Sequence, residues 1–356
     1  MTIKHSLKDL LPEEMETWAQ SKGYPTYKGR QMAQWIFQKG EDDPDSMHTL
    51  PKALRKLIHA EGNLHLTRLM SDNPIDVSQS NKFLFELSDG KAVESVYIPS
   101  EKRRTVCVSS QVGCPLNCTF CQTARMGFQR NLTPGEIVDQ VLHIRRLIPE
   151  TMTNVVFMGM GEPFLNFEAV IQAARILNHE SGLNIGARHI TVSTAGIVPQ
   201  ILAFAELPYQ FKLAVSLNAI RDDLRQTLMP VNRQYPLSAL LEAVKFYTRK
   251  THRRVTFEYV MMRNVNISQR DANELVARLS ELDCKLNLIP FNMTETPYER
   301  PTEKEIQFFT NYLQQRAPFP VMIRWSGGAD KQAACGQLYT QIKQKENHDG
   351  SPEKIS

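Results

Sequence analysis

The stretch Thr105-Val-Cys-Val-Ser-Ser-Gln-Val-Gly-Cys-Pro-Leu-Asn-Cys-Thr-Phe-Cys121 joins a short β-rich run to a dense group of cysteines. Its first five residues, 105–109, predict a buried strand. Cys114, Cys118 and Cys121 then follow in a loop with the spacing C-x3-C-x2-C. In a chain whose thiols stay reduced, such a group indicates metal binding or catalysis rather than a disulfide framework.

Downstream of this stretch, β-rich runs alternate with helical patterns. Strands are predicted at 105–109, 153–160, 188–194, 210–217, 254–261, 284–290 and 320–325, and helices at 134–148, 166–179, 237–250, 268–281 and 302–316. This alternation indicates βαβ units with parallel strands, so we expect an α/β fold. Six or so units predict a partial (β/α) barrel, in which ligands bind at the C-terminal ends of the strands.

The rest of the chain suggests smaller units around this barrel. Residues 1–78 show helical spacing and predict a small N-terminal accessory domain. Two β-rich runs joined by Asp89-Gly90 predict a hairpin, which we place in a linker at 79–103. The barrel is then expected at 104–342, and the polar tail 343–356 is expected to be disordered.

Composition excludes several classes of protein. The 356 residues are 42% hydrophobic and 22% charged, which is a globular balance rather than that of a disordered or fibrous chain. No apolar run approaches the roughly 20 residues that span a bilayer, and acidic residues interrupt the N-terminal segment where a signal peptide would be apolar. We therefore expect a cytoplasmic protein, and the net charge of +4 permits an RNA partner.

The three clustered cysteines are one ligand short of a closed site. A zinc or iron–sulfur site needs four ligands, so a cubane cluster held by Cys114, Cys118 and Cys121 would leave one iron open to a cofactor or substrate. The alternatives are a zinc site completed by a histidine or by Cys107, and three incidental cysteines. Phe120, beside the last cysteine, favours the cluster because an apolar wall tunes its potential and its exposure to solvent.

Small polar residues follow several of the predicted strands. Gly159-Met-Gly-Glu-Pro163 comes after one strand, and its glycines allow close approach of a ligand while Glu162 could hold an ammonium group or a ribose hydroxyl. Each of these segments alone is more typical of caps and turns, but strand ends converge on one mouth. The other segments are Ser193-Thr-Ala-Gly196, Ser216-Leu-Asn218 and Asn292.

The remaining cysteines have different expected roles. Cys107 ends the first barrel strand and Cys335 follows the last, so a closing barrel would bring them together, with Cys335 as a nucleophile and Cys107 as its resolving partner. Cys284 lies in an apolar strand and is expected in the core. Basic residues also cluster in the sequence, and either cluster is a phosphate-binding surface or a solvated face. The first, expected around the cysteine loop, comprises Lys102, Arg103, Arg104, Arg125 and Arg130, and the second extends from Lys245 to Arg254.

Taken together, these motifs resemble the RlmN/Cfr family of radical-SAM (S-adenosylmethionine) RNA methyltransferases over about residues 20–340. The resemblance rests on the cysteine stretch and on segments found in the family's order: Val93-Glu-Ser-Val-Tyr-Ile-Pro99, Gly127-Phe-Gln-Arg-Asn-Leu132, Gly159-Met-Gly-Glu-Pro163 and Ala333-Ala-Cys-Gly-Gln-Leu338. It implies a radical-SAM type of partial barrel, a [4Fe-4S] cluster on Cys114, Cys118 and Cys121, and methylation of adenine in 23S rRNA. The branch that this sequence resembles more, RlmN, acts on carbon 2 and often also on tRNA, whereas the Cfr branch acts on carbon 8.

The resemblance also implies roles for individual residues. Cys335 would accept a methyl group from a first SAM, and a second SAM at the cluster would generate the radical that activates it. Glu94 would remove the adenine C2 proton, and Cys107 would attack Cys335 to release the methylated RNA and leave a transient disulfide. SAM would be contacted by Gly161, Glu162, Ser193, Ser216, Leu217, Asn218 and Asn292. The implied partners are RNA and an electron donor such as a flavodoxin, with the chain as a monomer.

The sequence departs from the family pattern in three places. They are Ser326-Gly-Gly-Ala-Asp-Lys-Gln332 before the Ala-Ala-Cys segment, Asn218 where the family has His, and Gln122-Thr-Ala-Arg125 after the cysteines. None removes a catalytic group, but they bear on substrate preference and on C2 against C8. Two other functions share some of these features: a different radical-SAM enzyme, such as a glycyl-radical activase, and a non-enzymatic metal-binding module that binds RNA.

Overall fold

The computed structural model describes residues 6–70, 75–148, 150–293 and 296–325. Within them, a ten-stranded sheet runs in the order β1-β2-β3-β4-β7-β8-β9-β10-β11-β12. From β4 to β12 neighbouring strands are parallel, whereas β1 to β4 pair antiparallel. The strands are β1 Thr67–Leu69, β2 Asn81–Leu87, β3 Ala92–Ser100, β4 Arg103–Cys107, β7 Asn154–Phe157, β8 Ile190–Thr194, β9 Lys212–Ser216, β10 Val255–Met261, β11 Cys284–Pro290 and β12 Val321–Ile323.

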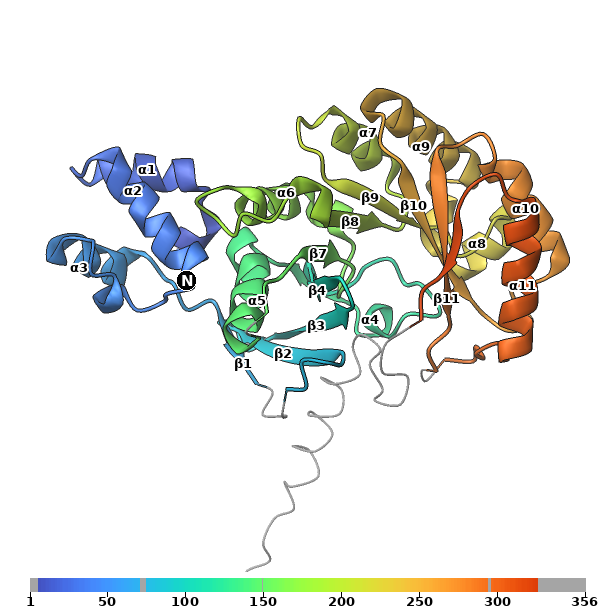
Figure 1. Cartoon of the computed structure of the whole chain (residues 1–356), viewed down its shortest axis with the longest axis horizontal. Helices are drawn as coiled ribbons and strands as arrows, with labels where there is room; N and C mark the ends of the chain where they lie inside the picture. Colours follow the sequence, from blue (N-terminus) through green and yellow to red (C-terminus); the bar gives the residue numbers. More distant parts are fainter. Residues whose placement is uncertain (1–5, 71–74, 149, 294–295, 326–356) are drawn as a thin grey trace, which may run out of the picture.

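The parallel part of the sheet confirms the α/β prediction, because every predicted strand contains or overlaps an observed one. Helices lie along the outside of the curved sheet (Figure 1). Three of them, α4, α7 and α8, were not predicted; α4 has four residues and α8 seven, too few to show a clear period. The helices of this part are α4 Gln122–Arg125, α5 Pro134–Leu147, α6 Phe167–Asn178, α7 Val198–Glu206, α8 Asp222–Leu228, α9 Leu237–Thr251, α10 Gln269–Leu279 and α11 Glu303–Arg316.

The N-terminal part is helical up to residue 61 and lies at one end of the molecule, beside α5 and α6 (Figure 1). The prediction of helical structure to residue 78 is wrong at its end, because Thr67–Leu69 forms β1 and pairs with β2. A three-residue strand carries no periodicity, so its partner decides its structure. The elements are η1 Leu7–Asp9, α1 Pro12–Ser21, α2 Thr26–Ala33, the π-turn η2 Gln34–Gln38, η3 Pro44–Ser46 and α3 Lys52–Glu61.

The hairpin of β2 and β3 is confirmed, with Gly90 in its turn at φ +76°. Strand β3 continues the sheet by pairing with β4, so that Val96 lies opposite Cys107. On its other side β4 pairs with β7. Both hydrogen-bonding edges of β4 are therefore occupied, and β12 remains at the opposite edge of an open barrel.

The apolar core runs through both parts of the chain without a break, from the N-terminal helices through the sheet to α11. In the described part of the chain, no helix combines the length and the apolarity needed to cross a membrane. The predicted disordered tail and Cys335 lie outside the described residues.

Candidate active site

The cysteine loop is anchored by a small antiparallel ribbon. Strand β5, Gln111–Gly113, pairs with β6, Phe128–Asn131, and the loop between them carries the three cysteines. Gly113 has φ +75°, and a Cβ there would lie 1.6 Å from the carbonyl oxygen of Gly127. Only glycine fits this crossing, which brings the two ends of the loop together. The amide of Cys114 then donates to the same Gly127 oxygen at 3.2 Å.

The three thiols lie close enough to influence one another electrostatically. Cys114 is buried, and Cys118 and Cys121 are partly buried. Burial, with further contributions from Cys121 and Glu162, raises the pKa of the Cys114 thiol to about 12. The pKa of Cys118 is also raised, first by burial and then by Cys121 and Cys114. Thiolates that repel one another in a buried site need a bound cation to form, as metal-binding thiolates do.

The spacing of these thiols is wider than a single ion requires. Among the described residues, the group whose ligand atoms all lie within 4.8 Å of one another is Asp43, Asp45 and His59 rather than the cysteines. A tetrahedral zinc site with bonds of roughly 2.3 Å would bring its sulfurs closer than this limit. The donor set, one buried and two partly buried cysteines with no fourth beside them in the described part of the chain, fits a cubane cluster that keeps one iron open.

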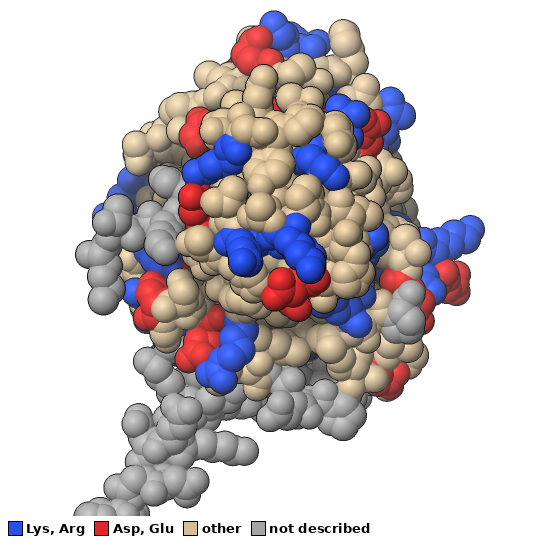
Figure 2. Space-filling model, turned by 90° about the vertical axis from the view of Figure 1, so that its left-hand side faces the viewer, with Lys and Arg blue, Asp and Glu red and all other residues tan. Residues whose placement is uncertain are grey.

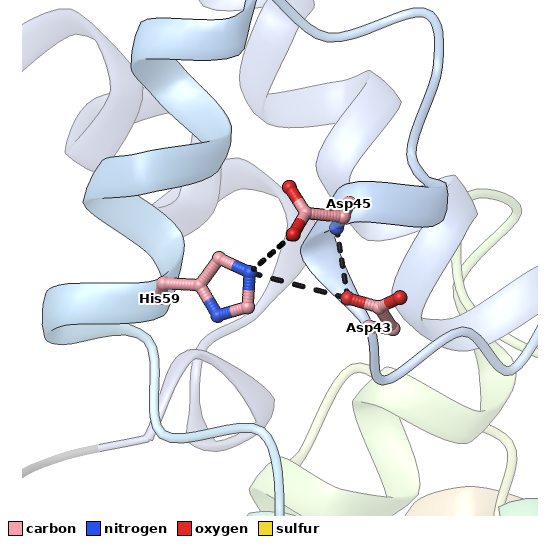
Figure 3. Close-up of side chains that lie close together, drawn as sticks. All are labelled: Asp43, Asp45 and His59. Atoms are coloured by element: carbon pink, nitrogen blue, oxygen red, sulfur yellow. Dashed lines mark hydrogen bonds and ion pairs between the residues drawn. The ribbon is translucent and has the colours of Figure 1, made fainter.

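The group of Asp43, Asp45 and His59 lies apart from the sheet, in the N-terminal helices (Figure 3). All three side chains are exposed, and His59 Nε2 is 3.3 Å from Asp45 Oδ2. Asp43 caps the short helix η3 by accepting from the Asp45 amide at 2.9 Å. Helix capping and surface ion pairing explain why these three side chains lie together, so we assign them no metal ion.

Glu162 lies in the predicted glycine-rich segment that follows β7, at the N-terminal cap of the short helix η4 Pro163–Asn166. It is 3% exposed, and its carboxylate accepts hydrogen bonds from the amides of Ala195, at 2.7 Å, and Phe164, at 3.0 Å. Burial raises its pKa to about 7 despite these hydrogen bonds. Gly161, at φ +101°, packs so closely on Gln111 that a Cβ would lie 2.6 Å from that side chain. The segment is thus held against the start of the cysteine loop, and Glu162 has an electrostatic effect on Cys114 and Cys118.

The hydroxyl group of Ser109 links the backbone of Glu94 to the glycine-rich segment. Ser109 Oγ donates to the carbonyl oxygen of Glu94 at 2.5 Å and accepts from the amide of Met160 at 2.9 Å. The amide of Glu94 in turn lies 3.4 Å from Met160 Sδ. Glu94 is buried, at the place where β3 passes the end of β4. The structure therefore places it close to the same end of the sheet as Cys107.

Cys107 is the last residue of β4 and is 5% exposed. Burial raises the pKa of its thiol to about 11, while Arg324 and the backbone of Met158 lower it. Arg324 follows β12, and its Nη1 lies 3.5 Å from Met158 Sδ. Cys107, Met158 and Arg324 thus meet inside the barrel from three different strands. Cys335 lies outside the described residues, so its predicted proximity to Cys107 stays a prediction.

The other residues predicted to contact SAM follow neighbouring strands. Ser193 and Ser216 lie at the ends of β8 and β9, and Leu217 continues β9 by donating its amide to the Glu258 carbonyl at 2.9 Å. Asn218, at φ +55°, uses its side chain inside the protein, where Oδ1 accepts from the Val260 amide at 2.9 Å. Asn292 follows β11 and is partly exposed. All of these residues occur where parallel strands end, as predicted.

Sequence reasoning missed two buried charged residues at this site. Arg225 in α8 is fully buried, and Glu258 in β10 is 5% exposed with one carboxylate oxygen, Oε2, that has no hydrogen-bond partner. The register places Glu258 between Ser216 and Asn287. The one signal in the sequence was the position of Glu258 inside a run of apolar residues in a strand. A glutamate at such a position is notable because Asp and Glu are rarely buried unless they are paired. For Arg225, a surface helix gave no such signal.

Two of the basic residues expected to surround the cysteine loop lie elsewhere, and a third is paired with acidic side chains. Arg103 and Arg104 begin β4 and so lie at the end of the strand opposite to Cys107. Arg130 forms ion pairs with Asp89 at 2.7 Å and Glu136 at 2.8 Å. The prediction of a basic rim is therefore wrong for Arg103 and Arg104, because the direction of β4 places them at its other end. Arg130 lies in β6 beside the cysteine loop, as expected, but its charge is taken up by these ion pairs. Cys284, by contrast, is 1% exposed in β11 and confirms its predicted place in the core.

Comparisons with known proteins agree with this geometry. Residues 108–279 match the Radical SAM superfamily, and residues 5–62 match the ribosomal RNA large subunit methyltransferase N-terminal domain. A probable dual-specificity RNA methyltransferase RlmN from Acaryochloris marina is 44% identical over 91% of this chain and 92% of its own length. The dual-specificity RNA methyltransferase RlmN from Desulfotalea psychrophila is 42% identical over 97% of each chain.

A solved structure extends the likeness to three dimensions. The crystal structure of a radical SAM methyltransferase from Sphaerobacter thermophilus is 45% identical, with a TM-score of 0.89 over 93% of this chain and 98% of that one. The sequence relatives and this structure cover both the N-terminal helices and the barrel. The chain therefore belongs to the RlmN/Cfr family of radical-SAM RNA methyltransferases.

Proposed function

We propose that the protein methylates carbon 2 of adenine in 23S rRNA and in tRNA, using two molecules of SAM and a [4Fe-4S] cluster. The observation that carries this proposal is the convergence of Cys114, Cys118 and Cys121 with Glu162 at the C-terminal ends of the strands. The relatives named as dual-specificity RNA methyltransferases, which match nearly the whole chain, support the substrate class.

The three cysteines would hold the cluster through their thiolates. When bound, the cluster and SAM supply a 5′-deoxyadenosyl radical. The chain's own part is to keep the site dry and to orient its ligands, which the burial of Cys114 and Glu162 favours. An aromatic C2–H bond of adenine is neither acidic nor nucleophilic, so a radical route avoids a barrier that polar methyl transfer would meet.

Glu162 is proposed to bind the ammonium group of SAM. Its carboxylate already accepts two backbone amides, and a carboxylate has about four acceptor positions, so capacity remains. An ammonium group would also offset the cost of ionising this buried side chain, whose pKa is about 7. The remaining SAM contacts are proposed at the strand ends, from Gly161, Ser193, Ser216, Leu217, Asn218 and Asn292.

Cys335, Glu94 and Cys107 are the proposed catalytic residues. Cys335 would accept a methyl group and present it, once activated, to adenine C2. Glu94 would take the C2 proton, and Cys107 would attack the Cys335 sulfur, releasing the RNA and leaving a disulfide that an external reductant must reopen. The burial of Cys107 keeps its thiol protonated until the reaction requires the thiolate, and Arg324 favours that thiolate.

The N-terminal helices, within the domain proposed at 1–78, are proposed to grip the RNA. Lys and Arg side chains are spread over this end of the molecule, interspersed with acidic ones (Figure 2). Three lysines here lie over aromatic rings, a combination that suits phosphates and unpaired bases. The pairs are Lys22 over Trp18, Lys28 over Tyr27 and Lys39 over Trp35, with the lysine nitrogen 3.4 Å from the ring centroid in the last.

The hairpin proposed at 79–103 would link the N-terminal domain to the barrel proposed at 104–342. The chain is proposed to act as a monomer in the cytoplasm. A one-electron donor such as a flavodoxin would reduce the cluster. The target adenine would be unpaired and splayed into the site, because an enzyme cannot reach a ring carbon within a stacked duplex.

Nucleoside mass spectrometry tests the proposed function. The protein would be reconstituted anaerobically with iron and sulfide and incubated with reductant, SAM and either 23S rRNA fragments or tRNA. We expect 2-methyladenosine from both substrates, loss of product in Cys335→Ala and Cys107→Ala, and retention in Cys284→Ala. Production of 8-methyladenosine would move the protein to the Cfr-like activity. A protein that binds only zinc and assembles no cluster would contradict the proposal.

A further inference from the structure

Arg225 is a fully buried cation without a carboxylate partner at hydrogen-bond distance in the described part of the chain. Its guanidinium donates to the carbonyl oxygens of Ala195 at 2.6 Å and Leu217 at 3.1 Å, and to Asn232 Oδ1 at 2.9 Å. Asp222, a carboxylate that acts on this charge, is exposed and is linked to it through Asn232, whose Nδ2 donates to Asp222 Oδ1 at 2.8 Å. A buried charge of this kind is costly and requires compensation from somewhere in the site.

The hydrogen bonds of Arg225 join two neighbouring strand ends. Ala195 directly follows β8 and Leu217 directly follows β9. Ala195 is also the residue whose amide donates to Glu162, so one peptide segment is held by a carboxylate on one side and a guanidinium on the other. Gly196 packs onto the same group, and a Cβ there would lie 3.3 Å from Arg225 Nη2. Arg225 thus extends the link between β8 and β9 beyond Thr194 and Val215, the last pair of their ladder.

The helix of Arg225 also contacts the cysteine loop. The amide of Thr119, between two of the cysteines, donates to the carbonyl oxygen of Leu228 at 3.0 Å, at the last residue of α8. Arg225 lies one turn earlier in this helix, and its charge acts on the Cys118 thiol. The backbone contact of Thr119 with Leu228 therefore places the loop segment next to Cys118 beside the helix that carries the buried Arg225, where charges are poorly screened.

We propose that Arg225 is a positioning residue that aligns the SAM-binding strand ends and supplies the positive charge that makes the adjacent cluster easier to reduce. The inference rests on the proposed function, since it requires a cluster on the three cysteines. Such a cluster with three thiolates carries a net negative charge that grows on reduction. A fixed cation beside it compensates that charge, and charge is one of the factors that set cluster potentials.

Two substitutions separate charge from alignment. Arg225→Met removes both the charge and the hydrogen bonds. Arg225→Lys keeps the charge, but its single nitrogen cannot reach all the acceptors that the guanidinium binds. Arg233→Met, at an exposed side chain that ends the short helix η6 Pro230–Arg233, changes the net charge equally and serves as the control. Each protein would be reconstituted anaerobically and assayed for iron content, for its midpoint potential by redox titration followed by electron paramagnetic resonance, and for SAM dissociation constant.

We expect Arg225→Met to have a more negative midpoint potential and a SAM dissociation constant raised about tenfold, the effect of losing charge-assisted hydrogen bonds. Arg225→Lys should keep a potential near that of the wild type but bind SAM as weakly as Arg225→Met. Arg233→Met should match the wild type in both measurements. An unchanged potential in Arg225→Met would refute the charge role, and unchanged SAM binding in both variants would refute the alignment role.

If Arg225→Met assembles no cluster, its iron content would still test whether the charge of Arg225 is required. Recovery of iron content in Arg225→Lys would support the role of the charge, whereas equal loss in both variants would overturn it. A wild-type protein that assembles no cluster would contradict the proposed function itself, before any variant is compared.

Discussion

Lys8 and Asp139 form an ion pair that is fully buried, although 131 residues separate them in the sequence. Lys8 belongs to η1 at the start of the chain, and Asp139 lies in α5 against the sheet. Asp139 also accepts from the amide and hydroxyl of Thr67 at 3.1 and 2.9 Å, while Lys8 pairs with Asp42 at 2.7 Å. The pair thus locks the N-terminal helices to the barrel.

Lys8→Met should destabilise the protein strongly. Removing one member of a buried ion pair leaves an uncompensated charge and costs about 3–5 kcal/mol. Urea unfolding of the metal-free protein would measure the change in the free energy of unfolding. Lys22→Met, which breaks the exposed pair with Glu61, is the matched control and should cost no more than about 1 kcal/mol. Equal losses in the two variants would show that the burial of Lys8 does not matter.

The same pair predicts how stability depends on pH. Burial alone would raise the pKa of Asp139, but His143 and Lys8 lower it to about 2. A carboxylate with a depressed pKa stabilises the fold above its unfolded value and loses that contribution as pH falls through the folded value. The wild type should therefore lose stability between about pH 4 and pH 2, a loss that Asp139→Asn should lack. Parallel acid-unfolding curves for the two proteins would contradict this.

Gly113→Ala should abolish assembly of the cysteine site. The new methyl group would meet the carbonyl oxygen of Gly127, 1.6 Å from the ideal Cβ position, so β5 and β6 must separate. Gly90→Ala provides the control, because Gly90 has nearly the same φ, +76°, but no atom within 4 Å of that position. We expect Gly90→Ala to cost about 1–2 kcal/mol and to reconstitute normally. Full iron content in Gly113→Ala would show that the crossing is not required.

Glu162→Gln should weaken SAM binding while leaving the cluster in place. The amide keeps one acceptor oxygen for the backbone but loses the charge proposed to hold the ammonium group. Loss of a charged hydrogen bond predicts a dissociation constant raised by about tenfold or more, measurable by anaerobic calorimetry. The exposed Glu168 in α6, changed to Gln, is the control. Wild-type affinity in Glu162→Gln would assign the ammonium group to another residue.

Arg324→Gln should make the Cys107 thiol less reactive. The pKa of this thiol is about 11, so its alkylation rate in the wild type should rise about tenfold per pH unit between pH 8 and 10. Without the guanidinium, the pKa should be higher and the rate lower at every pH in this range. Mass spectrometry of the Cys107 peptide after timed exposure to iodoacetamide gives the rate. Identical rates in the two proteins would remove Arg324 from the proposed chemistry.

The sequence was sufficient for those parts of the molecule whose signals are local. The strands from 105–109 onward alternate with helices, and the cysteines lie eight residues apart or fewer, so both could be predicted without coordinates. The glycine-rich segment at 159–163 also follows its strand directly. These features need no knowledge of which strands are neighbours.

What could not be predicted depends on pairing between distant segments. Arg225 looks like an ordinary helix residue until Ala195 and Leu217 are known to lie beside it. Arg130 looks like a free cation until Asp89 and Glu136 are placed against it. Charged side chains acquire their roles from their partners, and neither composition nor periodicity encodes those partners.

The two occupied edges of β4 have a consequence for access. A barrel that closes by backbone hydrogen bonds admits only molecules that fit through its ends, but here β3 occupies the edge that β12 would need. Side chains such as Arg324 and Met158 meet across the gap instead. Side-chain contacts can part without breaking a sheet, so this arrangement would allow one base of the proposed RNA substrate to approach while the rest of the molecule stays outside.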